Sequence, residues 1–512
     1  MQLRLTLLAA TTVLLSACGG SESDSASSQT RIACADLKAS QLSSAEMSAI
    51  SLSKTQLVAA AGAMPEYCRV EGTVSGEPGS AIGFAANIPT TSWNGRFLML
   101  GNGGYAGGSL PAAGADVAAG YATAVTDTGH TATDPSVFYN NRITEIDYGY
   151  RAVHLTAAIA KQVTNKVTGA APSYSYFNGC STGGRQALMS AQRYPNDFDG
   201  IIAGAPAHKL TGLAVEQNWS LRQFQQNNFA GNIFGKVNLL ANAVKSTCAD
   251  PEGIVNPGVC NFDPSTLQCP AGTDAATCLT AAQVTAVKAV YSGPRSSNGT
   301  PWYPGKPLGS EASWASWLVG DSTDPAKWSP LQGGFGFSFV NNIFFETDPD
   351  KSYKWTDFNF DTDPPKGVFM GNILNATNPD LSAFNARKSK LLMYHGTGDG
   401  LIGYQPTLEY FQQVQGQMGE TVSKGFARMF LVPGMDHCDY FDRGGLSVTD
   451  WLNPIVNWVE KGVAPDAVAA KSKTPGNSLT RPVCAWPNVA TYSGSGDRTT
   501  AANWSCKAAA VR

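Results

Sequence analysis

The feature that most constrains this chain is residues 178–185, NGCSTGGR, which contain a Gly-x-Ser-x-Gly motif centred on Ser181. An aromatic, strand-like run, Tyr174 to Phe177, precedes it, and a helix-like segment, Gln186 to Tyr194, follows it. A strand, this motif and a helix together form a nucleophile elbow, a tight turn that exposes the serine hydroxyl. The turn is so tight that side chains at Gly179 and Gly183 would clash. A glycine-rich loop carrying an ordinary surface serine is the alternative.

The N-terminus predicts export rather than folded structure. An apolar run, Leu5 to Leu15, is too short to span a bilayer and ends in LSAC, which resembles a bacterial lipobox. We therefore expect residues 1–17 to be a lipoprotein signal peptide, lipid to be attached to Cys18, and residues 18–31 to form a flexible tether. An ordinary secretory signal is the alternative. Either way we expect an exported protein, in the bacterial cell envelope (the outer membrane) or secreted, whose only membrane contact is this lipid.

The composition restricts the possible partners. The net charge is −3 and no cluster of Lys and Arg occurs, which argues against nucleic acid. Eleven cysteines suit an oxidising compartment. With Cys18 set aside, spacing suggests the local pairs Cys34–Cys68, Cys248–Cys260, Cys269–Cys278 and Cys484–Cys506. Cys180 and Cys438 are left over. Zinc is discounted because no C-x-x-C pair occurs.

Strand-like and helix-like segments alternate on both sides of the motif. The expected strands are 97–101, 121–125, 174–177, 200–205, 390–394 and 428–432, and the expected helices are 147–164, 186–194, 407–418 and 448–461. This alternation is typical of a mostly parallel sheet, so we predict the α/β class and an α/β-hydrolase core.

The alternation stops between His208 and Pro365, where Trp, Phe, Asn and Gly are frequent. We therefore predict a catalytic domain of residues 32–207 and 366–512 with a large inserted lid domain of residues 208–365. Most aromatic side chains of the lid are expected to form its core, and one or two to line a substrate pocket.

A serine nucleophile needs a base to remove its proton and an acid to orient that base. In α/β-hydrolases the chain order is Ser, then Asp or Glu, then His, with the acid and the base on loops after late strands. His437 follows the strand expected at 428–432, and Asp399 follows the one at 390–394. We therefore predict Ser181, Asp399 and His437 as the catalytic triad.

Other acids and histidines compete for these roles. Asp436 and Asp439 are too near His437 in sequence to reach its Nδ1 easily, so Asp399 is preferred. The histidines outside the expected positions are interpreted as structural or pocket groups; they are His130, His154 and His208.

The two leftover cysteines flank the predicted nucleophile and base. Cys180 precedes Ser181, and Cys438 follows His437. If Ser181 and His437 are within hydrogen-bond reach, their neighbours can approach to the Cα separation of roughly 4.4–6.8 Å that a disulfide needs. We therefore predict a Cys180–Cys438 disulfide that joins the two catalytic loops.

A glycine-rich segment, NGGYAGG at residues 102–108, follows the strand expected at 97–101. In this fold a loop at that position supplies one amide of the oxyanion hole. Glycine allows the backbone N–H to approach the substrate carbonyl without an intervening side chain. A plain turn is the alternative.

At these residues the chain resembles the tannase and feruloyl esterase family. The motifs that carry the resemblance are GCSTGGR at 179–185, YHG at 394–396 with Asp399, and GMDHC at 434–438. TDTGH at 126–130 and the C-terminal segment from Arg481 to Cys506 support it. The similarity runs from about Cys34 to the end of the chain.

The resemblance implies an α/β-hydrolase with a lid that cleaves esters of aromatic acids. It assigns the nucleophile, the acid, the base and the Cys180–Cys438 disulfide to the same residues as above. It further implies oxyanion donors at the amide of Thr182 and in the loop at Gly103 and Gly104. His395 would be a pocket residue, and we also expect Ile402 to bind substrate.

Members of this family usually carry a structural calcium loop in the lid. The matching stretch here is residues 248–256, where the candidate ligands are Glu252, Ile254 and Asn256 and the first acid position holds Ala249. Calcium favours several charged oxygens, so we expect a weakened or lost site, with the Cys248–Cys260 disulfide holding the loop. No cofactor is expected to be required for catalysis.

The family includes hydroxycinnamate, gallate (tannase) and mono(2-hydroxyethyl) terephthalate hydrolases. The last would need a cation, most naturally an arginine, for the free carboxylate of the substrate. The lid holds only Arg222 and Arg295, so we favour feruloyl-type esters and keep the other two as alternatives. A non-catalytic surface lipoprotein that binds aromatic or glycan ligands is an alternative of another class, against which the complete Ser, Asp and His set argues.

Overall fold

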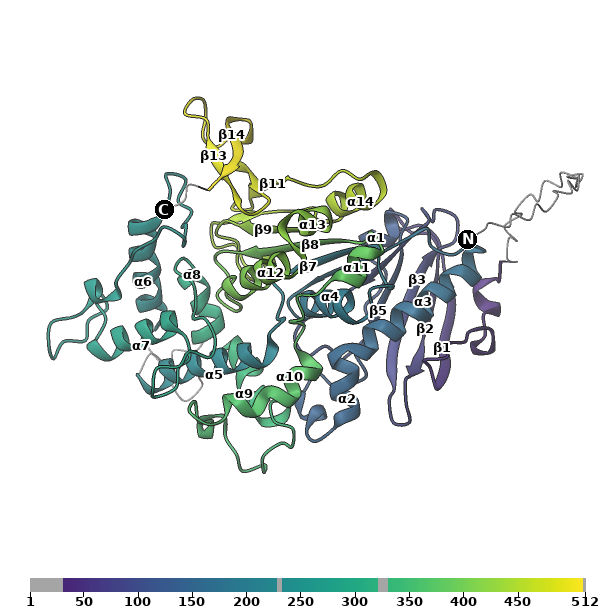
Figure 1. Cartoon of the computed structure of the whole chain (residues 1–512), viewed down its shortest axis with the longest axis horizontal. Coiled ribbons are helices and arrows are strands. Elements are labelled where there is room, and N and C mark those ends of the chain that lie inside the picture. Colours follow the sequence, from purple (N-terminus) through teal and green to yellow (C-terminus); the bar gives the residue numbers. More distant parts are fainter. Residues whose placement is uncertain (1–30, 228–232, 321–329, 510–512) are drawn as a thin grey trace, which may run out of the picture.

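The computed structural model describes residues 31–227, 233–320 and 330–509 (Figure 1). The predicted signal peptide and the predicted lipidation site at Cys18 lie outside these ranges, as does the tether up to residue 30. Within the described ranges, no helix combines the length and the apolar character that crossing a membrane requires.

A nine-stranded sheet forms the centre of the molecule, in the order β1-β2-β3-β5-β4-β6-β7-β8-β9. Three neighbouring pairs, all at the β1 end, are antiparallel, and the five others are parallel. This confirms the prediction of a mostly parallel sheet. The strands are β1 (Ala49–Val58), β2 (Tyr67–Ser75), β3 (Ile82–Pro89), β4 (Arg96–Leu100), β5 (Ala122–Thr126), β6 (Tyr174–Cys180), β7 (Gly200–Gly204), β8 (Lys390–Gly396) and β9 (Ala427–Val432).

Apolar clusters cover both faces of this sheet. Side chains of α3 (Ala152–Thr168), α4 (Thr182–Arg193) and α12 (Gln405–Met418) pack on one face. On the other face lie α14 (Leu452–Lys461) and a small sheet of β10 (Leu446–Ser447), β11 (Ala467–Ser472) and β12 (Thr480–Cys484). All five residues of β7 are buried. A strand buried on both faces has a continuous apolar sequence, and this is why the strand could be predicted from the sequence.

The C-terminal hairpin of β13 (Asn488–Tyr492) and β14 (Trp504–Ala508) projects from the body of the molecule (Figure 1). The first strands and the N-terminal end of the described chain lie at the opposite end from helices α6 (Ile233–Cys248) and α7 (Ala281–Ser292). The remaining short helices are α1 (Ala115–Ala118), α2 (Arg142–Ile146), α10 (Val368–Leu374), α11 (Ser382–Ala386) and α13 (Glu420–Phe426).

All four predicted helices start elsewhere: α3 starts at Ala152 after a π-helical turn, Asp147–Arg151, and α12 starts at Gln405. The other two starts have a local cause. Helix α4 begins at Thr182 rather than at Gln186. Glycine disfavours helix, but a Cβ at Gly184 would lie 2.2 Å from the carbonyl oxygen of Gly204, so the close contact with β7 requires glycine. Helix α14 begins at Leu452 rather than at Val448, because the Asp450 carboxylate accepts hydrogen bonds from the first two helical amides.

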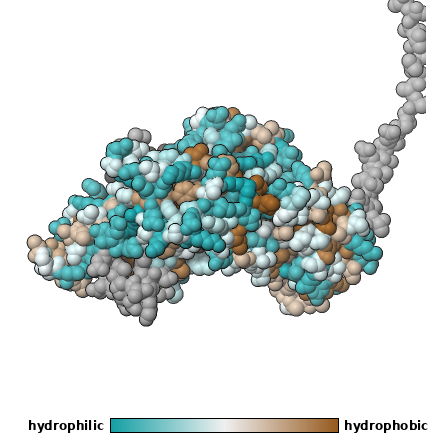
Figure 2. All heavy atoms as spheres, turned by 90° about the horizontal axis from the view of Figure 1, so that it is seen from below, coloured by the Kyte–Doolittle hydropathy of each residue, from teal (hydrophilic) through white to brown (hydrophobic). Residues whose placement is uncertain are grey.

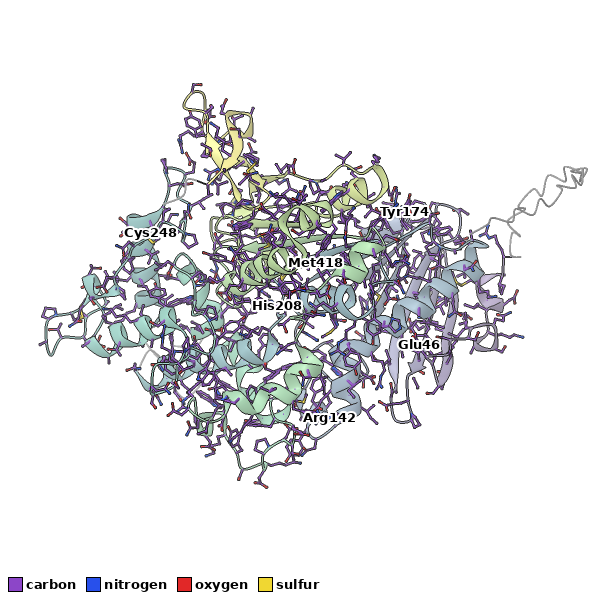
Figure 3. All side chains as sticks on the ribbon, in the orientation of Figure 1. Glu46, Arg142, Tyr174, His208, Cys248 and Met418 are labelled. Carbon is purple, nitrogen blue, oxygen red and sulfur yellow. A yellow bond between two sulfur atoms is a disulfide. The ribbon has the colours of Figure 1, made fainter. Side chains whose placement is uncertain are left out.

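The segment between β7 and β8 contributes no strand to the central sheet among its described residues. Its described α-helices are α5 (Leu210–Gln226), α6 (Ile233–Cys248), α7 (Ala281–Ser292), α8 (Glu311–Trp314) and α9 (Leu331–Asn342), followed by α10 and α11. An apolar cluster forms its interior, and a second joins it to the catalytic core. His208, labelled in Figure 3, lies where the chain passes from the sheet into this segment.

The five disulfides of the structure are the five predicted pairs. They are Cys34–Cys68, Cys180–Cys438, Cys248–Cys260, Cys269–Cys278 and Cys484–Cys506. Four are local, but Cys180–Cys438 joins residues 258 positions apart, with Cα atoms 6.0 Å from each other. It therefore connects the end of β6 to the loop after β9.

Candidate active site

Ser181 lies at the sharp turn between β6 and α4. Its φ of 63° and ψ of −121° are unusual for a residue with a side chain, and such strain persists only where surrounding contacts enforce it. Its N–H donates to the carbonyl oxygen of Gly204 at 3.0 Å. A Cβ at Gly179 would lie 2.6 Å from the backbone of Gly183, so the predicted need for glycine at this turn is confirmed.

The glycine-rich loop at residues 102–108 is held against this turn. The amide of Gly183 donates to the Asn102 carbonyl oxygen at 2.7 Å, and the Thr182 hydroxyl donates to the carbonyl oxygen of Gly104 at 2.6 Å. The backbone N–H groups of Gly103, Gly104 and Thr182 donate no hydrogen bond to any described residue. These are the amides predicted for the oxyanion hole, and Thr182 is also the first residue of α4, where the helix dipole favours negative charge.

Asp399 and His437 form a buried pair on the loops after β8 and β9. Nδ1 of His437 lies 2.7 Å from Oδ2 of Asp399, and their side chains are 5% and 0% exposed. An ionised carboxylate only accepts, so this nitrogen carries the proton and Nε2 is left with its lone pair. The arrangement can supply a neutral histidine base with a fixed tautomer.

Four donors hold Asp399. Its Oδ1 accepts the amides of Leu401 and Ile402 at 2.9 and 2.8 Å, and its Oδ2 lies 3.2 Å from Nε2 of His395 as well as near His437. Burial alone would raise the pKa of Asp399, but its electrostatic interactions and hydrogen bonds with His437 and His395 outweigh burial and lower that pKa. The carboxylate therefore stays ionised.

The prediction that His395 lines the pocket is wrong. Its side chain is 0% exposed, and it is not among the residues that surround the cavity at Ser181. Nδ1 lies 2.9 Å from the hydroxyl of Thr407, while Nε2 lies 2.9 Å from the carbonyl oxygen of Ile402. A motif beside the acid cannot show which way the ring points. Here it points inward and supports Asp399.

The competing acids have other partners. Asp436 accepts a hydrogen bond from Ser313 of the lid at 2.7 Å, and that hydroxyl also lies 3.2 Å from the Gly398 carbonyl oxygen. Asp439 accepts from Ser447 and pairs with Lys473 at 3.0 Å. Burial, together with the charge of Asp399, raises the pKa of Asp436. Neither side chain is bonded to the ring of His437.

The Cys180–Cys438 disulfide links the turn that holds Ser181, the predicted nucleophile, to the loop that holds His437, the predicted base. It joins the residue before Ser181 to the residue after His437. No hydrogen bond links Ser181 to His437 within the part of the chain described; Nε2 of His437 lies 3.6 Å from the Cys438 sulfur instead. Catalytic hydrogen bonds are often long when no substrate is bound. The disulfide holds the two loops close together, and the hydrogen bond between Ser181 and His437 would form when substrate binds.

A narrow apolar pocket opens at Ser181. Its described lining comprises Gly104, Tyr105, Tyr148, Ser181, Thr182, Ala207, Leu210, Leu213, Ala214, Gln217, Phe335, Phe339, Leu401 and Ile402. Ile402, predicted to bind substrate, is among them, and residues 208–365 supply two aromatic rings, Phe335 and Phe339. The cavity volume is about 40 Å³, so an aromatic acyl group can enter only if side chains move. None of these side chains carries a charge.

One face of α5 forms a wall of this pocket, which the sequence analysis missed. Leu210, Leu213, Ala214 and Gln217 follow the i, i+3, i+4, i+7 spacing of a single helix face. The spacing was visible in the sequence as a stripe along one helix face, but the sequence did not show that this face lies against the Ser181 pocket.

Comparison with known proteins identifies the family. The family model described as "Tannase and feruloyl esterase" matches residues 68–507. The chain belongs to this family. It is therefore a carboxylic ester hydrolase.

Relatives and solved structures agree with this membership. The mono(2-hydroxyethyl) terephthalate hydrolase of Piscinibacter sakaiensis is 33% identical over 88% of this chain and 86% of the relative. A probable feruloyl esterase B of Emericella nidulans is 31% identical over 86% of each chain. The crystal structure of feruloyl esterase B from Aspergillus oryzae superposes with a TM-score of 0.77 at 27% identity, covering 91% of this chain and 98% of that one. The α/β-hydrolase fold is thereby confirmed.

The other histidines of this tannase-family chain have structural surroundings. His130 packs edge-on against Phe138 at 4.9 Å and meets the glycine-rich loop at Gly107. His208 is buried, which lowers its pKa to about 4. His154 lies on α3, where Nδ1 is 2.7 Å from Asp197 and Nε2 is 2.7 Å from Glu46. None of the three lines the pocket.

The loop that corresponds to the calcium site of the family does not fit the ion. The Glu252 carboxylate is held by Arg481 at 2.7 Å and by Arg498. The Ile254 carbonyl oxygen accepts the amide of Asp250, and the Asn256 side chain accepts the amide of Gly258. All three predicted ligands are thus engaged within the protein, and no cluster of three His, Cys, Asp or Glu side chains suited to a metal occurs in the described ranges.

Proposed function

We propose that this chain is a serine esterase that hydrolyses esters of hydroxycinnamic acids, the feruloyl type, through an acyl-enzyme on Ser181. One observation carries the proposal. The Asp399–His437 pair lies on loops that the Cys180–Cys438 disulfide joins to the Ser181 turn, beside a pocket without a charged lining residue in the described chain.

The chemistry follows from the protonation state of His437. Nε2 takes the Ser181 proton as the hydroxyl oxygen attacks the ester carbonyl carbon. The resulting imidazolium is stabilised by Asp399, which stays ionised. The ester C–O bond breaks, and the alcohol leaves with the proton from Nε2. A water molecule then attacks the acyl carbon and gives one proton to Nε2 of His437. The C–O bond to Ser181 breaks, the serine oxygen takes that proton back from Nε2, and the aromatic acid leaves.

The oxyanion of each tetrahedral intermediate would accept hydrogen bonds from backbone amides. The candidates are the amide of Thr182 and those of Gly103 and Gly104, none of which is engaged elsewhere in the described chain. Backbone donors fixed before reaction cost no reorganisation when the charge develops. The hydrogen bond from Thr182 to the Gly104 carbonyl oxygen supports this role, because it keeps the two sets of amides together.

The pocket supports a neutral acyl group. Arg222, a candidate clamp for a terephthalate carboxylate, donates to the Phe358 carbonyl oxygen at 2.7 Å instead. Arg222 and Arg295 both border a separate surface hollow beside Trp219. The relative from Piscinibacter sakaiensis acts on a terephthalate monoester, so that ester and gallate esters remain the substrates to compare with methyl ferulate.

We also propose that residues 208–365 act as a lid and that the protein is exported, with a lipid on Cys18 as its membrane anchor. The narrow pocket between α5 of this segment and the Ser181 turn supports the first part. The lipobox-like LSAC motif supports the second. Catalysis would require no metal, because the proposed reaction uses protein groups and water only.

The test is a side-by-side assay of methyl ferulate, methyl gallate and mono(2-hydroxyethyl) terephthalate. We expect the highest kcat/KM with methyl ferulate, and no turnover by Ser181→Ala, whose circular dichroism should match that of the wild type. A p-nitrophenyl ester should give a burst in the wild type alone. Unchanged turnover by Ser181→Ala would refute the assignment, and the absence of any hydrolysis would favour a binding lipoprotein.

A further inference from the structure

The Ser181 pocket contains a single polar side chain that is not engaged by the described protein, apart from the serine itself. The hydroxyl of Tyr105 donates to the Phe335 carbonyl oxygen at 2.7 Å, and that of Tyr148 donates to Gly104 at 3.0 Å. The Thr182 hydroxyl is likewise used. The side-chain amide of Gln217 has no hydrogen-bond partner among the described residues, although Gln217 is only 5% exposed. Buried polar groups normally have a partner.

Gln217 occupies a position where an apolar side chain would continue the pocket wall. It ends the stripe that begins with Leu210, Leu213 and Ala214 on α5. Its backbone is held in place, since the Gln332 amide donates to its carbonyl oxygen at 3.2 Å. Helix α9 also packs closely, because a Cβ at Gly336 would lie 3.2 Å from the Gln217 Cβ. The backbone and Cβ of Gln217 are therefore held in place by α9.

The position along α5 sets the reach of the pocket. The start of this segment lies at the level of the nucleophile, because the amide of Ala207 donates to the Ser181 carbonyl oxygen at 3.1 Å. Gln217 lies seven residues after Leu210, which at 1.5 Å per residue is roughly 10 Å along the helix. Ser181 and Gln217 line the same pocket, so a cinnamoyl group on Ser181 that extends along α5 would bring the far edge of its ring to Gln217. A benzoyl ring, without the vinyl unit, ends short of it.

We propose that Gln217 is a specificity-determining residue that hydrogen-bonds the ring hydroxyl of 4-hydroxycinnamoyl esters. The proposal rests on the proposed function and names the substrate class of the same site. An amide both donates and accepts, as does a phenol, so the two groups satisfy each other. A cinnamoyl ester without the hydroxyl leaves the amide unpaired, and a site built to pair with a hydroxyl discriminates against a substrate that lacks it.

The experiment compares the wild type with Gln217→Leu on three methyl esters: 4-hydroxycinnamate, cinnamate and 4-hydroxybenzoate. The wild type should prefer 4-hydroxycinnamate over cinnamate by about tenfold in kcat/KM, the value of one buried hydrogen bond. Gln217→Leu should abolish that preference, mainly by raising KM for the hydroxylated ester. The loss on 4-hydroxybenzoate should be smaller, because its hydroxyl lies short of residue 217.

Two further variants make the result decisive. Gln225→Leu makes the same change on the exposed face of α5 and should retain the preference. Gln217→Met removes the amide but keeps the length of the side chain, and it should match Gln217→Leu even if the latter folds poorly. A preference that survives in both Gln217 variants, or an equal loss on the benzoate, overturns the role of Gln217. A wild type that hydrolyses none of the three esters overturns the proposed function instead.

Discussion

Two loops of this protein each hold a carboxylate out of solvent, and they do so in opposite ways. Asp399, in the loop after β8, is 0% exposed and is held by two backbone amides and two histidines. Glu252, in the lid loop between Cys248 and Cys260, is 6% exposed and is held by the guanidinium groups of Arg481 and Arg498. No lysine or arginine of the described chain pairs with Asp399.

The difference follows from what each carboxylate must do. Asp399 faces a histidine that gains a positive charge during the proposed reaction. A permanent cation beside it would compete with that charge, whereas neutral dipoles keep the acid ionised and available. Glu252 has no such partner, so arginines can neutralise it permanently. The C-terminal segment thereby ties this loop to the rest of the protein through Arg481 and Arg498.

Changing Asp399→Asn should have the largest effect. The amide cannot hold the proton on Nδ1 of His437, so we expect kcat on methyl ferulate to fall by about 10⁴. The matched control is Asp436→Asn, which changes the adjacent buried acid that bonds Ser313 rather than the His437 ring. An equal loss in both variants, or less than a tenfold loss in Asp399→Asn, would contradict the assignment of the acid.

Removing the disulfide between the catalytic loops should come next. Changing both Cys180 and Cys438 to Ser opens a link across 258 residues, and we expect unfolding free energy to fall by about 4 kcal/mol, with loss of esterase activity. Urea denaturation and kcat would measure the two effects. The same double change at Cys269 and Cys278, 9 residues apart in the lid, should cost less stability and retain activity.

Breaking the ionic attachment of the lid loop should have a smaller effect on activity than on stability. Arg481→Ala removes the cation paired with the half-buried Asp250 and leaves the buried Glu252 with Arg498 alone, so we expect a loss of about 1–2 kcal/mol in unfolding free energy. Arg498, 36% exposed, should matter less. If the arginines replace an ion, neither EDTA nor added Ca²⁺ should shift the wild-type Tm. A rise in Tm with Ca²⁺ would contradict that.

The smallest effect concerns the pH dependence of the lid. Burial raises the pKa of Glu311 from 4.5 to about 7, against hydrogen bonds from Tyr291 and Gly309. As the pH rises from about 4.5 to 7, Glu311 is ionised in the unfolded chain but keeps its proton in the folded protein. The free energy of unfolding should therefore fall by roughly 1 kcal/mol per pH unit over this range. Glu311→Gln should remove this decline. The exposed Glu420→Gln is the control, and an unchanged slope in Glu311→Gln would refute the assignment.

The face of the molecule shown in Figure 2 is mostly hydrophilic, with apolar residues in scattered groups. Single exposed apolar residues are normal on soluble domains.

The sequence by itself determined the parts whose chemistry is local. The glycines around Ser181 are required by the turn itself, and the buried strands appear as continuous apolar runs. The Cys180–Cys438 pair was predictable because each cysteine adjoins a residue that the proposed reaction must bring together. Residues adjacent in the chain lie close in space, so the inferred approach of Ser181 to His437 implied that Cys180 lies near Cys438.

Tertiary structure alone decided which way side chains point and which distant segments meet. His395 lies in a motif beside Asp399, yet its ring turns inward to support the acid instead of lining the pocket. Gln217 was one polar residue in a helical stripe until packing placed it opposite the Ser181 turn. Arg481 lies 229 positions from Glu252, and only packing of the C-terminal segment against the lid joins them. Such contacts depend on the whole fold, because no local pattern encodes the partner.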